Sequence, residues 1–170
     1  KKRPYGLRDF SPANFRDPNG PALTEADWQK VAAGRGLLFI HGTFSNTASS
    51  FSKLWQQHPQ RVASLFAHYG QRVYALDHPT LMASPIANAL MLAQALPQGA
   101  KLHLVTHSRG GLVAEVLARA AANPELKDED VSALAAPEQR DLKALASLLG
   151  DKQVRVERVV RVACPARGTL

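Results

Sequence analysis

The residues best suited to chemistry in this sequence form the string Thr-His-Ser-Arg-Gly-Gly at positions 106–111. A short apolar run at 102–105 precedes this string, and an amphipathic run at 112–118 follows it. This order predicts a strand, a sharp turn and a helix, with Ser108 at the tip of the turn. A hydroxyl at that place lies near the positive end of the helix, where a nucleophile is useful. Ser108 is therefore the first candidate for a nucleophile.

A nucleophilic serine also needs a base for its proton and hydrogen-bond donors for the oxyanion that its attack creates. We expect the backbone N–H of Arg109, the residue after the serine, to be one donor. The loop after the first strong apolar run should supply the second, because Gly42 lets the chain turn toward the site. That donor is the backbone N–H of Thr43 or, as an alternative, of Phe44. Each such donor is typically worth about 10²–10³ in rate.

The elements that must position these residues alternate along the chain. Apolar runs predict four strands, at 36–40, 72–76, 102–105 and 158–163. Helical patterns are expected at 52–69, 84–96, 112–120 and 138–149. Strands that alternate with helices at this spacing predict βαβ units and a parallel sheet.

Two segments lack a clear pattern. Residues 1–34 contain several prolines, so we expect an irregular leader with one short helix capped by Thr24. Residues 123–137 are polar and acidic and predict a surface connector with at most one helical turn. A lid over a substrate site is the alternative for this second segment.

The composition of the chain indicates which classes of protein it can belong to. The chain has 170 residues, 45% of them hydrophobic, which predicts one globular domain. The single cysteine, Cys164, excludes an internal disulfide and is expected to be a small apolar residue at a strand end. No apolar run reaches 18 residues, so no transmembrane segment is expected. The sequence has no glycine-rich phosphate motif and no metal-ligand spacing, so we expect no cofactor and no metal.

The formal net charge of +7 comes largely from basic residues near the two ends of the chain. They are not interleaved with aromatic residues, and no nucleic-acid-binding module is visible. We therefore expect no nucleic-acid partner, and we interpret these residues as a solvated surface or as a contact with acidic parts of a larger parent chain. They are Lys1, Lys2, Arg3, Arg8, Arg16, Lys152, Arg155, Arg158, Arg161 and Arg167.

The elbow string, together with the apolar strand that ends in His41-Gly42, resembles the α/β-hydrolase superfamily, in its lipase and esterase branch, over about residues 35–164. Strings at 38–46, 77–79 and 163–169 also resemble an uncharacterised hydrolase-like domain of large bacterial multidomain proteins. The resemblance implies an α/β fold with a doubly wound, mainly parallel sheet, truncated after the sixth family strand. Residues 35–170 would then be the N-terminal part of this domain, after the leader at 1–34.

In that family the nucleophile is followed in sequence by an acid, commonly after the seventh strand, and by a histidine after the eighth. All six histidines of this chain precede Ser108. The resemblance therefore implies that the acid and the base are missing from this chain. The chain also departs from the family at Thr106, where a glycine or another small residue is usual.

Some of the histidines are weaker candidates. By the resemblance, His41 shapes the oxyanion loop, and its use as a base is an alternative. Asp77 and His78 pair an acid with an imidazole at a strand end, but that strand should lie two strands from Ser108, about 10 Å away. We expect this pair to frame the pocket entrance or to turn the chain. His107 should point to the opposite face of its strand from its neighbour and be structural.

These observations predict a serine hydrolase that acts on carboxylic esters, including lipids, through an acyl-enzyme on Ser108. The expected partners are a small-molecule ester or lipid substrate and the remainder of a larger parent chain, in a cytoplasmic location. A catalytically inactive hydrolase-like scaffold or binding module is the alternative. Acyl transfer to an acceptor other than water is a third interpretation that uses the same residues.

Overall fold

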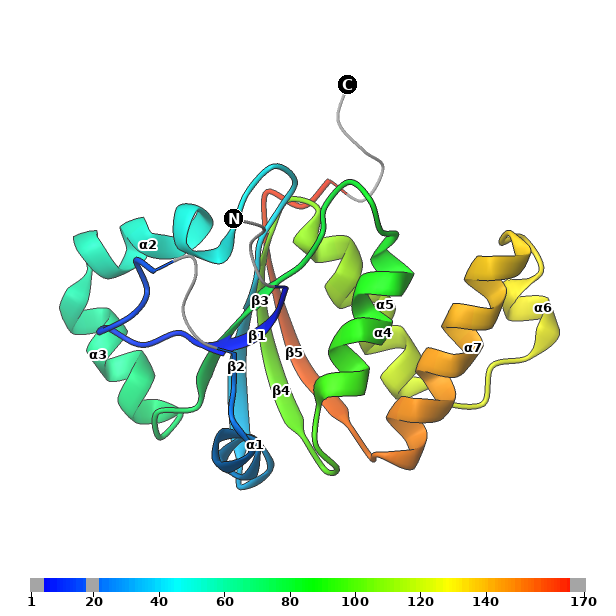
Figure 1. Cartoon of the computed structure of the whole chain (residues 1–170), viewed down its shortest axis with the longest axis horizontal. Helices are drawn as coiled ribbons and strands as arrows, with labels where there is room; N and C mark the ends of the chain where they lie inside the picture. The colour runs from blue at the N-terminus through cyan, green and yellow to red at the C-terminus, as the bar shows by residue number, and fades with distance from the viewer. Residues whose placement is uncertain (1–4, 18–21, 166–170) are drawn as a thin grey trace.

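The computed structural model describes residues 5–17 and 22–165 of the chain. Within them lies one sheet of five strands, in the order β1-β3-β2-β4-β5 (Figure 1). Strands β2 to β5 run parallel, and β1 pairs with β3 in the antiparallel sense. The chain therefore has an α/β fold with a mostly parallel sheet. The strands are β1 Gly6–Asp9, β2 Arg35–Ile40, β3 Val73–Asp77, β4 Lys101–His107 and β5 Arg155–Val162.

Helices cover both faces of this sheet. Helices α2 and α3 pack on one face, and α4, α5 and α7 pack on the other (Figure 1). The helices in the described residues are α1 Glu25–Ala32, α2 Thr47–Gln57, α3 Pro59–His68, α4 Pro85–Ala95, α5 Gly110–Ala122, α6 Asp128–Val131 and α7 Ala136–Asp151. None of them is long and apolar enough to span a membrane.

Alternation along β2 builds the two halves of the core. Leu37 and Phe39 point to the side of α2 and α3, where the Phe39 ring meets Trp55 at 5.3 Å between ring centroids. Leu38 and Ile40 point to the other side and join the larger cluster beneath α4, α5 and α7. Because both faces are buried, β2 reads as a continuous apolar run rather than an alternating one.

The N-terminal segment differs from the expectation of an irregular leader. Its described part supplies β1 at one edge of the sheet, and Leu7 pairs with Leu76 of β3. It also supplies α1, whose first turn is capped by the hydroxyl of Thr24, as the sequence predicts. The expected basic residues Lys1, Lys2 and Arg3, and Arg167 at the other end, lie outside the described residues.

The single helix expected at 52–69 is wrong, because the structure has two helices there. Asn46 caps α2, so that helix begins five residues earlier than expected. It ends at Gln57, and Pro59 begins α3. Proline has no N–H for the preceding turn, but it fits the first turn of a new helix, where that N–H has no helical acceptor. The connector at 123–137 contains only the one-turn helix α6 before α7 begins, in agreement with the sequence.

Candidate active site

Ser108 lies at a tight bend between β4 and α5. Strand β4 ends at His107 and α5 begins at Gly110, so only two residues connect them. Ser108 has a φ of +50°, a left-handed conformation that costs energy for a residue with a side chain. Its N–H donates to Val162 O at 3.0 Å, and its carbonyl accepts from Gly111 N at 3.0 Å. These bonds hold the strained turn that the sequence predicts for a nucleophile elbow.

Two glycines let the neighbouring segments approach this elbow. A Cβ on Gly110 would lie 2.4 Å from the carbonyl oxygen of Ile40, so α5 begins directly against the end of β2. A Cβ on Gly42 would lie 2.7 Å from the Cβ of Ser108. The loop from β2 to α2 therefore lies directly against the serine.

The hydrogen bonds of this loop show which candidate oxyanion donors already have an acceptor. The N–H of Phe44 donates to Thr80 Oγ1 at 3.3 Å, so it is engaged away from the elbow. The N–H groups of Thr43 and Arg109 have no acceptor within residues 5–17 and 22–165. Of the three candidate donors, Thr43 and Arg109 are thus the ones whose backbone N–H groups have no acceptor in the described residues.

The side chain of Thr106 does not occupy the elbow. It is fully buried, and its hydroxyl donates to Val160 O at 3.2 Å and lies 3.4 Å from Cys164 Sγ. Gly111 makes room for this arrangement, because a Cβ there would lie 2.6 Å from the Cβ of Cys164. The departure from the family at Thr106 is therefore accommodated on the side of β5.

His41 lies beneath the loop and is completely buried. The backbone N–H of His78 donates to its Nε2 at 3.2 Å, which assigns the ring proton to Nδ1. Nδ1 lies 2.8 Å from the carbonyl oxygen of Gly42 and donates to it. Both ring nitrogens therefore bind backbone groups, the carbonyl of Gly42 and the N–H of His78, and neither contacts Ser108.

Asp77 is buried at the end of β3 and forms the centre of a polar network. Its carboxylate accepts from the backbone N–H of Thr47 at 3.0 Å and from the Thr47 hydroxyl at 3.2 Å. The guanidinium of Arg8 lies 2.9 Å from its other oxygen. A buried carboxylate is stable only with such partners. Asp77 thus links β1 to the start of α2.

The pair Asp77-His78 does not meet Ser108. Strand β2 lies between β3 and β4, so the two strand ends are two sheet spacings apart. His78 is buried and stacks on His41, with 4.3 Å between the ring centroids. The structure places this pair beneath the loop rather than at the entrance of a pocket.

No histidine of the chain hydrogen bonds to Ser108, and all six lie within the described residues. His107 packs edge-on against Phe51, with 6.5 Å between ring centroids. His103 accepts a hydrogen bond from the Tyr69 hydroxyl at 2.7 Å. His58 and His68 are exposed at the two ends of α3. In the described residues Ser108 therefore has no base.

Ser108 opens onto a pocket of about 310 Å³ between α5 and the end of β5. Glu115 in this pocket forms ion pairs with Arg119 and Arg161. The pocket is lined by Ser108, Gly111, Leu112, Glu115, Arg119, Arg161, Cys164 and Pro165. Sequence reasoning missed Glu115 and Arg161 as pocket residues, because only the pairing of β5 with β4 brings Arg161 beside the elbow.

Arg109 has a second role that the sequence did not indicate. Its guanidinium donates from Nη2 to Ala83 O at 2.8 Å and so connects the elbow to the loop between β3 and α4. No cluster of three or more histidine, cysteine or acidic side chains in the described residues could hold a metal ion.

The fold and the elbow define an α/β protein in which a strained serine faces the carboxyl edge of a mostly parallel sheet. The chain belongs to the family described as "Domain of unknown function (DUF7379)", whose model matches residues 2–139 and thus includes Ser108 and the oxyanion loop. No curated protein and no solved structure matches the chain.

Proposed function

We propose that this chain is the nucleophile-bearing part of a serine hydrolase of the α/β-hydrolase type that cleaves carboxylic esters. The observation that carries the proposal is the left-handed elbow of Ser108 beside two backbone N–H groups that have no acceptor among the described residues. Preorganised donors of this kind have little structural use and a large effect on acyl transfer.

In this proposal Ser108 Oγ attacks the ester carbonyl carbon while a base takes the hydroxyl proton. The former carbonyl oxygen becomes an oxyanion that the N–H groups of Thr43 and Arg109 stabilise. The alcohol then leaves with the proton, and an acyl-enzyme remains on Ser108. Water attacks this ester in the second half of the reaction, and the acid is released with Ser108 restored.

The base and its acid must then come from outside the described residues, because the six histidines of the chain are engaged elsewhere or exposed. The far edge of the sheet supports an incomplete hydrolase fold. Strand β5 has no neighbour beyond it in the described chain, and Val160 and Val162 on it are exposed. An unpaired edge strand is a feature that proteins usually cover or protect with charged side chains.

A catalytically inactive scaffold is the second candidate, and the lack of a base at Ser108 favours it. The two candidates differ in what the elbow does when a base is supplied. In the enzyme, an external base such as imidazole should activate Ser108, because the oxyanion donors are already in place. In a scaffold, Ser108 should behave as an ordinary surface hydroxyl.

A fluorophosphonate probe with and without added imidazole tests this difference by intact mass and peptide mapping. We expect labelling at Ser108 that imidazole accelerates and that Ser108→Ala removes. The matched control is Ser64, an exposed serine of α3 whose hydroxyl donates to Gln60 O. If Ser108 labels no faster than Ser64 under every condition, the scaffold is the better description.

A further inference from the structure

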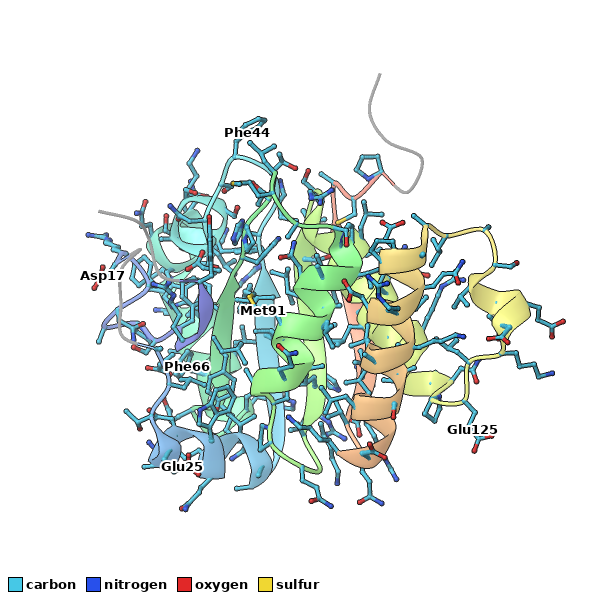
Figure 2. The ribbon with its side chains drawn as sticks, turned by 45° about the vertical axis from the view of Figure 1, so that its right-hand side comes forward. Asp17, Glu25, Phe44, Phe66, Met91 and Glu125 are labelled. Carbon is cyan, nitrogen blue, oxygen red and sulfur yellow. The ribbon has the colours of Figure 1, made fainter. Side chains whose placement is uncertain are left out.

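Three large apolar side chains project from the two loops that border the elbow. Phe44 in the loop from β2 to α2 is 84% exposed, and Leu81 and Met82 in the loop from β3 to α4 are 66% and 95% exposed. We call these three residues the apolar tip. Figure 2 shows Phe44 at the outermost point of its loop, directed into solvent. Exposed apolar groups that gather in one place mark surfaces that bind something.

The apolar tip is held in position by the same residues that build the site. The N–H of Phe44 donates to Thr80 Oγ1, which ties the two loops together. Phe44 has a φ of +54°, so the chain accepts a strained conformation that directs this ring outward. The guanidinium of Arg109 holds the second loop through Ala83 O. The two loops that expose the apolar tip are thus held in place by hydrogen bonds.

The two loops that carry the apolar tip contain no acidic residue. Between Asp27 and Glu115 the sequence contains one carboxylate, Asp77, which is buried against Arg8. Glu115 is itself paired with two arginines. The 87 residues from 28 to 114 thus place no exposed carboxylate on either loop, while the chain as a whole carries a charge of +7.

We propose that the apolar tip inserts into the surface of an anionic lipid bilayer. A projecting tip of phenylalanine, leucine and methionine suits the boundary between headgroups and acyl chains, where each side chain enters separately. Loops without carboxylates do not repel anionic headgroups, and the net charge of +7 attracts the chain to them. Phe44 lies at the outermost point of its loop and is directed into solvent, which suits entry into a lipid surface. This inference goes beyond the proposed hydrolysis and does not depend on it.

Co-sedimentation with vesicles tests the inference. We expect the chain to bind vesicles of phosphatidylcholine that contain phosphatidylglycerol, and to bind pure phosphatidylcholine vesicles much more weakly. The triple variant Phe44→Ser, Leu81→Ser, Met82→Ser should lower the affinity by at least about tenfold, since three apolar side chains no longer insert. The matched control is Val160→Ser with Val162→Ser, two valines exposed on β5; it should bind like the unaltered chain.

Three results would overturn the inference. The first is an unaltered chain that does not sediment with anionic vesicles. The second is a triple variant that binds as well as the unaltered chain, which would mean that net charge alone causes the binding. The third is self-association, seen by analytical ultracentrifugation, that the triple variant abolishes without any vesicle binding; this would assign the tip to a protein contact.

Circular dichroism and urea denaturation check that the variants are folded, which is expected because the altered side chains are exposed. Ser108→Ala should bind vesicles normally. Failure of the hydrolase proposal would appear in probe labelling, whereas failure of the lipid proposal would appear in vesicle binding. Binding by Ser108→Ala without probe labelling of the unaltered chain would leave the lipid inference standing alone.

Discussion

The backbone of Gly42 lies against the side chain of Ser108, and the space between them admits no further side chain. A Cβ on Gly42 would lie 2.7 Å from the Cβ of Ser108 and 3.3 Å from its Oγ. The same contact holds the loop that contains Thr43 against the elbow. Both the stability of the fold and the proposed chemistry therefore depend on this close approach. Adding one methyl group at Gly42 tests the two effects together.

Gly42→Ala should force the oxyanion loop away from the elbow. We expect a loss of about 1–3 kcal/mol in the free energy of unfolding, the usual cost of overpacking, and loss of the imidazole-accelerated labelling of Ser108. Urea denaturation and the fluorophosphonate assay measure the two effects.

The control for this substitution is Gly99→Ala. Gly99 also has a positive φ, of +73°, but a Cβ there would meet nothing within 4 Å. Its substitution should cost about 1–2 kcal/mol through backbone strain and leave labelling intact. Normal labelling in Gly42→Ala would show that the contact does not position the donors.

Asp77→Asn should be among the most destabilising single substitutions in the chain. The carboxylate is buried, and the amide would remove the negative charge that faces the guanidinium of Arg8. Breaking a buried pair in this way costs about 3–5 kcal/mol. Urea denaturation measures the loss, and we expect Ser108 labelling to fall with it, because Asp77 also holds the start of α2 through Thr47.

A double-mutant cycle with Arg8→Met separates the ion pair from the rest of the network. We expect the double variant to be more stable than the sum of the single losses implies, because no uncompensated charge remains. The exposed pair Lys127–Glu129, at 3.7 Å, is the control, and its removal should change little. Additive losses for Arg8 and Asp77 would contradict the assigned pairing.

The strands that cross the middle of the sheet were the easiest elements to predict. Strands β2 and β3 are buried on both faces, so their residues form continuous apolar runs that no helix pattern imitates. Strand β1 was not predicted as part of the sheet. It has four residues, and one of them, Arg8, is buried and forms an ion pair with Asp77, which is 69 positions away in the sequence. Local pattern cannot show such a pairing.

The same distinction holds for the candidate site. The elbow could be predicted because its signal is local: a strand, a serine, a glycine and a helix within a few residues. The break between α2 and α3 was missed because the apolar stripe continues on one side across Pro59, from Trp55 to Val62. Arg161 could not be assigned to the pocket, because its contact with Glu115 requires β5 to lie beside β4.

Lys152→Met should destabilise the junction of α4 and α7. The ammonium group donates to three carbonyl oxygens at the end of α4, those of Ala93, Gln94 and Leu96, at 2.7–3.0 Å. Burial lowers the pKa of Lys152 below its usual value, so part of the benefit of these bonds is offset by desolvation. We expect a net loss of about 1–3 kcal/mol, because the carbonyls lose a charged donor.

Urea denaturation of Lys152→Met and of Lys143→Met tests the assignment. Lys143 pairs with Asp128 on an exposed surface, so the second variant should lose much less stability. Equal losses in the two variants would mean that the three carbonyls are adequately hydrated without Lys152.

His103 should make the stability of the fold depend on pH. Its ring lies on the sheet face near Tyr69, Glu157, Arg35 and Arg158. Burial is the main cause that lowers the pKa of His103 below its usual 6.5; the two arginines act in the same direction and Glu157 opposes them. The folded chain therefore binds this proton less readily than the unfolded chain does.

Between the lowered pKa and 6.5 the unfolded state carries more of this proton, so the free energy of unfolding should rise as the pH rises through that window. Acidification through the same window should destabilise the fold, and His103→Gln should flatten the dependence. His58→Gln, which alters an exposed histidine outside this cluster, should keep it. Urea titrations at a series of pH values measure the slope. A slope in His103→Gln equal to that of the unaltered chain would show that other groups carry the dependence.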